Sequence, residues 1–135
     1  MRIHLLLGAL ALSTTMGAHI GAHAANGDDL LSKQYSACMD NSGGVTVKMQ
    51  DCISAETKRQ DVTLNEAYKN VMDAQTPARK KQLTEVQRMW LKYREANCKF
   101  YADPNGGTLA SVSANVCFMN ATASRAAELA GMVQR

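Results

Sequence analysis

The side chains of this chain that are best suited to acid–base chemistry near neutral pH are its carboxylates and its three histidines. A glycosidase needs two carboxyl groups, and a pair could be drawn from several acidic residues. Every chain of this size offers such pairs, however, and no serine, glycine-rich or metal-binding motif supports one here. The sequence therefore predicts no catalytic residues, no metal, no cofactor and no enzyme. The candidate carboxylates are Asp61, Glu66, Glu95 and Glu128.

The first 24 residues have the features of a secretory signal peptide. Arg2 gives a positive start, an apolar run covers residues 5–12, and small residues precede a cleavage point after Ala24. The apolar run is too short to span a bilayer, and no second run follows it. We therefore expect a periplasmic or secreted mature chain, residues 25–135, that forms one domain.

Removal of residues 1–24 changes the chemistry that is available. The mature chain would contain no imidazole, which excludes Ser-His-Asp catalysis, Cys-His catalysis and histidine-ligated zinc. Loss of Arg2 leaves 14 basic against 12 acidic side chains, a net charge near +2. That charge is too small to indicate a nucleic acid or a membrane surface as the partner. The histidines removed are His4, His19 and His23.

The four cysteines predict a disulfide framework. An even number of cysteines in a small exported chain is typical of disulfides, and the absence of Cys-x-x-Cys argues against zinc or a thioredoxin-like motif. Three pairings are possible. We expect Cys38–Cys52 and Cys98–Cys117, because each pair joins neighbours across a predicted turn. Each closed loop would stabilise the fold by roughly 3 kcal/mol.

Turn and capping residues predict an all-α domain. A short N-terminal helix over residues 28–40 would end at Gly43-Gly44, and a long helix would run from residue 47 to about residue 75 after Thr46 as N-cap. Thr76-Pro77 begins a third helix that should reach about Ala102. A fourth follows Thr108 as cap. The expected architecture is a small disulfide-linked bundle of three longer helices plus the short first one.

Periodicity predicts which faces of these helices are packed. The second helix contains an uninterrupted polar stretch, residues 56–61, which we interpret as a solvated surface or, alternatively, as a polar contact surface for a partner. The apolar face of the third helix should contain Leu83, Val86, Trp90, Tyr93 and then Phe100 or Tyr101. That of the fourth should contain Val112, Val116, Met119, Ala123, Ala127 and Ala130.

Six motifs occur in a fixed order along the chain. They are Cys52, D-V-T-L-N-E-A-Y (residues 61–68), Q-R-M-W-L-K-Y-R-E-A-N-C (residues 87–98), Gly106-Gly107-Thr108, Cys117 and T-A-S-R-A-A-E-L (residues 122–129). This succession resembles the lysozyme inhibitor LprI family over roughly residues 35–130. Arg94-Glu95 stands where that family more usually has Arg-Asp. The resemblance implies a small exported helical domain with two disulfides, in a family that takes its name from a member that inhibits lysozyme.

The polar and aromatic residues of these motifs predict a structural seam between helices. Trp90 and Arg94 are four residues apart, so the guanidinium can lie over the indole, and Cys98 is one turn further on the same face. An ion pair between Asp61 and Arg94 would fix the register of two helices. The predicted seam comprises Asp61, Asn65, Tyr68, Trp90, Arg94, Thr122, Arg125 and Glu128.

The function that this sequence favours is binding to a protein partner. The first hypothesis is an inhibitor of lysozyme or of another cell-wall-degrading enzyme. The second is a periplasmic interaction or envelope-maintenance protein with a different partner, and the third is a carboxylate-based cell-wall hydrolase. For an inhibitor, the contact surface should lie off the seam, in residues 40–46, 56–61 or 103–108, because a loop held by a nearby disulfide loses little entropy on binding.

Overall fold

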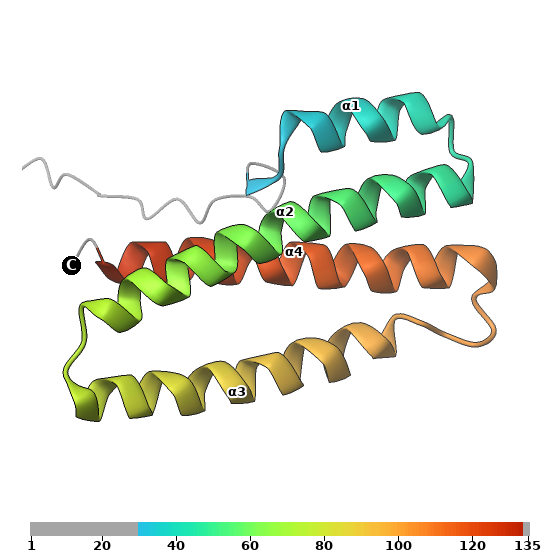
Figure 1. Ribbon diagram of the computed structural model, residues 1–135. Coiled ribbons are helices and arrows are strands. Elements are labelled where there is room, and N and C mark those ends of the chain that lie inside the picture. Colours follow the sequence, from blue (N-terminus) through green and yellow to red (C-terminus); the bar gives the residue numbers. More distant parts are fainter. Residues whose placement is uncertain (1–29, 134–135) are drawn as a thin grey trace, which may run out of the picture.

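The computed structural model describes residues 30–133, which form an all-α bundle as predicted (Figure 1). The predicted signal peptide and residues 28 and 29 of the predicted first helix lie outside the described residues. A short helix precedes three long ones, and no strand occurs between residues 30 and 133. The helices are α1 (Lys33–Ser42), α2 (Thr46–Asp73), α3 (Pro77–Phe100) and α4 (Gly107–Val133).

The long helices α2 and α4 lie side by side and form the centre of the molecule (Figure 1). Helix α1 packs along the first half of α2, and α3 packs on α4. One core cluster lies near the α1 end and contains Ile53, Val112 and Met119, with Tyr35 against it. The second lies toward the other end and contains Leu64, Ala67, Val71, Ala126 and Leu129, with Leu83 and Trp90 against it.

Local capping residues mark both ends of α1 and the start of α3. The Ser32 hydroxyl accepts a hydrogen bond from the Tyr35 backbone N–H at 3.1 Å and caps α1, which ends at Gly43 with φ of 58°. The predicted cap at Thr76 followed by proline is present. The predicted cap at Thr46 is wrong by one residue, because Val45 occupies that position and no side chain caps α2. Helix α4 similarly begins at Gly107, one residue before the predicted cap.

Both predicted disulfides are present. Cys38 pairs with Cys52 between α1 and α2, with 5.7 Å between the Cα atoms. Cys98 pairs with Cys117 between α3 and α4, with 5.4 Å between the Cα atoms. No free cysteine remains among the described residues. Each disulfide therefore links a helix to its neighbour in the sequence.

The predicted apolar face of α3 is wrong in part. Leu83 and Trp90 lie against the core, but Val86, Tyr93, Phe100 and Tyr101 are exposed. The reason is that Arg94 and Cys98, which share a face with Trp90, point at α4 and turn the other apolar residues aside. On α4, Val112, Met119 and Ala123 are buried and Val116 is half-buried as part of the core, but Ala127 and Ala130 are exposed; the inward positions there are Thr122, Arg125, Ala126 and Leu129.

Candidate binding site

The centre of the seam is the stacked guanidinium of Arg94. Its Cζ atom lies 3.8 Å from the ring centroid of Phe118 and 4.8 Å from that of Trp90. Its Nη1 donates to the Thr122 hydroxyl at 2.8 Å and lies 3.7 Å from the Asp61 carboxylate, so the ion pair expected from the sequence is present. The side chain is only 11% exposed. Arg94 thus joins α3 to both α2 and α4.

Burial and the neighbouring charges shift the pKa of Arg94 in opposite directions. Burial lowers the pKa of its guanidinium, while the nearby negative charges of Asp61 and Glu95 raise it. The Nε atom is buried and has no hydrogen-bond partner within the described chain. Thr122 is fully buried and donates its own hydroxyl proton to the Phe118 carbonyl at 2.7 Å, which leaves its oxygen free to accept from Arg94. These contacts pack α3 against α2 and α4 and fix the register of the helices.

A second buried arginine extends the seam along α4. Arg125 is 5% exposed, and its Nε donates to the Gln87 amide oxygen at 3.0 Å. Its Nη1 donates to the Glu128 carboxylate at 2.7 Å, and its Cζ lies 5.9 Å from the Trp90 ring centroid. The indole therefore has a guanidinium near it from each of two helices. The Nη2 atom of Arg125 is buried without a partner among the described residues.

The α2 residues of the seam line a cleft between α2 and α3 of about 330 Å³. Asp61, Asn65 and Tyr68 come from α2, and Gln87 and Arg94 come from α3. The Tyr68 hydroxyl lies 3.3 Å from that of Thr84, which itself donates to the Lys80 carbonyl, so the tyrosine must be the donor. All eight predicted seam residues thus lie around Arg94, around Arg125 or in this cleft, where Asn65 is the exposed member on α2.

Two residues of the seam were missed from the sequence. Phe118 supplies the closer ring for Arg94, and Gln87 holds Arg125. Gln87 stands three residues before Trp90 and opens the motif of residues 87–98, which was the available signal for it. Phe118 follows Cys117, whose pairing with Cys98 directs this part of α4 toward α3.

The interpretation of residues 56–61 as a solvated or partner-binding surface is wrong for two of its members. Glu56 is fully buried and Gln60 nearly so. The Glu56 carboxylate accepts from the Ser32 backbone N–H at 2.9 Å, the Ser32 hydroxyl at 2.6 Å, Gln60 Nε2 at 2.7 Å and Arg59 Nε at 2.7 Å. Gln60 also donates to the Leu30 carbonyl at 3.0 Å. This cluster holds the start of the described chain onto α2.

Hydrogen bonds outweigh burial at Glu56. Burial alone would raise the pKa of its carboxyl group, but the donors from Ser32, Gln60 and Arg59 lower it from 4.5 to about 2. The group is therefore ionised at neutral pH while it is fully buried. The Glu56 carboxylate has a structural role, because its four donors come either from Ser32, which it holds onto α2, or from α2 itself.

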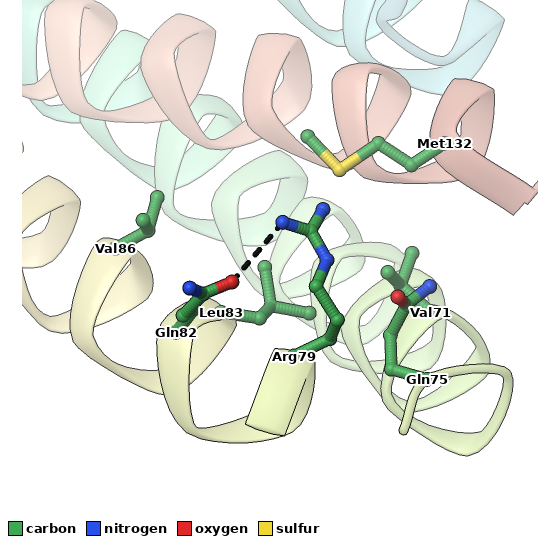
Figure 2. A pocket seen from close by; sticks show the side chains of 7 residues that line it. All are labelled: Val71, Gln75, Arg79, Gln82, Leu83, Val86 and Met132. Atoms are coloured by element: carbon green, nitrogen blue, oxygen red, sulfur yellow. Dashed lines mark hydrogen bonds between the residues drawn. The ribbon is translucent and has the colours of Figure 1, made fainter. Parts of the chain in front are cut away.

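A hollow of about 320 Å³ opens where α3 begins and α4 ends (Figure 2). Its walls are apolar apart from Arg79, Gln75 and Gln82, and Arg79 Nη1 donates to the Gln82 amide oxygen at 3.1 Å. The Arg79 guanidinium extends toward the α4 side, where Met132 lies (Figure 2). The residues that line the hollow are Val71, Gln75, Arg79, Gln82, Leu83, Val86 and Met132.

Two of the four candidate carboxylates are held in ion pairs with the buried or half-buried arginines of the seam. Asp61 is paired with Arg94, and Glu128 is paired with Arg125. Glu66 and Glu95 are exposed, one on α2 and the other on α3. Within residues 30–133, no group of three or more histidine, cysteine or acidic side chains could hold a metal ion. The ion pairs of Asp61 and Glu128 contribute to helix packing.

The comparisons with known proteins identify a family. The model of the family described as lysozyme inhibitor LprI matches residues 38–129, which include both disulfides and all eight seam residues. No curated protein and no solved structure matches the chain. The family and the disulfides are those of an extracytoplasmic protein. Among the helices described, none combines the length and the apolar character needed to cross a membrane.

Proposed function

Because the chain belongs to the lysozyme inhibitor LprI family, we propose that it is an exported protein that binds and inhibits lysozyme or another cell-wall-degrading enzyme. Residues 1–24 would direct export, and the mature chain would act in the periplasm or outside the cell. The observation that carries this proposal is the family match over residues 38–129. The packing of the seam supports it: Thr122 and Arg125 are buried and Arg94 is half-buried between helices, and side chains committed to packing are not free for catalysis.

The two disulfides support the same proposal because they make the domain more rigid. A surface held by two cross-links loses little conformational entropy when a partner binds, which favours tight binding by a small domain. Reduction should therefore weaken inhibition by loosening the scaffold, even though neither disulfide needs to contact the enzyme. A protein that acted as a flexible tether would not show this dependence.

A cell-wall clearing assay tests the proposal. The mature chain, residues 25–135, is titrated into lysozyme acting on purified cell wall, once in its oxidised form and once reduced and alkylated. We expect the oxidised form to slow clearing and the reduced form to act more weakly. Clearing that stays unchanged at a large molar excess of oxidised protein would refute the function. Soluble fragments released from the wall by the protein alone would support a hydrolase instead.

A further inference from the structure

Helix α3 has an apolar side that the bundle does not use. Only one of its 24 residues, Cys98, is buried. Four apolar side chains on another side are exposed: Val86 by 43%, Met89 by 62%, Tyr93 by 64% and Phe100 by 86%. Their spacing of three, four and seven residues places them along one side of the helix over about 20 Å. We call these four residues the α3 stripe.

The α3 stripe is separate from the seam and continues the hollow at the end of the bundle. Trp90, Arg94 and Cys98 occupy the side of α3 that faces α4. Val86 belongs both to the stripe and to the wall of the hollow (Figure 2). Apolar side chains that line up over this length on a small domain mark an interaction surface more often than isolated exposed residues do.

Charge is distributed unevenly between α3 and the rest of the domain. Helix α3 carries seven basic and two acidic side chains, whereas the rest of the described chain carries six basic and eight acidic ones. Lys92 is exposed and lies one turn after Met89, so it borders the stripe, and Lys99 is exposed in the last turn of the helix next to Phe100. The surface around the stripe is thus both apolar and basic. Its partner should offer apolar or sugar-binding walls together with carboxylates.

The substrate cleft of a cell-wall glycosidase has this chemistry. Such enzymes place two carboxyl groups on either side of the bond that they cleave, within a groove shaped for sugar rings. We propose that the α3 stripe, with Lys92 and Lys99, docks in this carboxylate-lined cleft and blocks it. The inference rests on the proposed function and adds the surface and the part of the enzyme that it meets.

The C-terminal end of the stripe is suited to enter a cleft. Phe100 and Tyr101 lie edge to face, with ring centroids 6.3 Å apart and planes at 82°. Both follow Cys98, whose disulfide to Cys117 fixes the last turn of α3. Two exposed rings carried on a constrained helical turn, beside a lysine, can fill a sugar-binding groove at a reduced entropic cost. An anionic membrane is the other surface that an apolar, basic stripe could meet.

Two double variants of the mature chain test the surface. Tyr93→Ala/Phe100→Ala removes the aromatic part, and Lys92→Glu/Lys99→Glu reverses the charge. The matched controls, Val47→Ala/Val62→Ala on α2 and Lys33→Glu/Lys48→Glu on α1 and α2, change similarly exposed residues. We expect each α3 variant to raise the concentration for half-inhibition of lysozyme about tenfold or more, and the controls to shift it by less than about twofold. A soluble oligosaccharide that occupies the cleft should compete with the wild-type protein.

The outcomes separate this inference from the proposed function. Inhibition by wild type that both α3 variants retain would overturn the surface and leave the function standing. A wild-type protein that neither binds nor inhibits lysozyme would overturn both. Sedimentation with phosphatidylglycerol vesicles covers the membrane alternative: vesicle binding that the α3 variants lose, with inhibition retained, would overturn the inference. A dimer that the α3 variants dissociate without loss of inhibition would overturn it in favour of self-association.

Discussion

Ionised and fully buried, Glu56 makes the stability of this domain depend on acid pH. Its pKa is 4.5 when unfolded and about 2 when folded, so folding favours the ionised form. The corresponding stabilisation is roughly 3 kcal/mol. It is fully present above the unfolded pKa and is lost as the pH falls toward the folded one. By about pH 3, some 2 kcal/mol of it should be gone.

Replacement of Glu56 by Gln removes this titration and keeps the size of the side chain. The variant should be about 3 kcal/mol less stable near neutral pH, because the amide lacks the charge and cannot accept from all four donors. In acid the wild type loses the same contribution, so the stability gap between the two proteins should narrow by about 2 kcal/mol at about pH 3.

Urea denaturation followed by far-UV circular dichroism measures this gap at neutral and acid pH with the disulfides intact. Glu66→Gln is the matched control, since Glu66 is an exposed glutamate on the same helix. The control should stay close to wild type at every pH. A gap between wild type and Glu56→Gln that does not change with pH would refute the assignment of the acid sensitivity to Glu56.

Three further substitutions test the packing. Arg94→Ala should cost about 3 kcal/mol in the free energy of unfolding, because two aromatic contacts and the hydrogen bond to a buried hydroxyl are lost. Arg94→Lys should keep only part of that stability, and thermal melts of the two variants would show the difference. Replacement of Cys98 and Cys117 together by serine should cost about 3 kcal/mol by urea denaturation, and an unchanged midpoint would contradict this. Met119→Ala should cost about 2–5 kcal/mol, since that side chain is fully buried, and a loss below about 1 kcal/mol would contradict the assignment of the core.

The features that depend on neighbouring residues could be predicted from the sequence. Thr76-Pro77 defines a helix start by local backbone chemistry. The pairing Cys38–Cys52 follows once the two helices are known to be consecutive and antiparallel. The Asp61–Arg94 ion pair could be proposed because each residue occupies a defined place in its motif. The helix start and the disulfide needed only a short stretch of chain, whereas the ion pair joins two helices and came from the charges at two motif positions.

Features that depend on distant contacts could not be predicted. Glu56 stands in a polar stretch that has the composition of a solvated surface, and its burial depends on Ser32, which is 24 residues away. Helix periodicity similarly groups Trp90 with Tyr93, but the stacking of Arg94 on Phe118 sets the rotation of α3 and leaves Tyr93 outside. The elements that pack against a helix decide its rotation about its axis. Periodicity alone does not tell which of two adjacent apolar sides faces the core.

The short span of each disulfide has a mechanical consequence. The cross-links enclose loops of 14 and 19 residues, and each lies within one helical hairpin. The halves α1–α2 and α3–α4 are therefore joined to each other by the α2–α3 connection and by the non-covalent interface of α2 with α4. A force applied between the two ends of the domain would peel one oxidised hairpin from the other, and the cross-links would shorten the fully extended chain only by their two small loops.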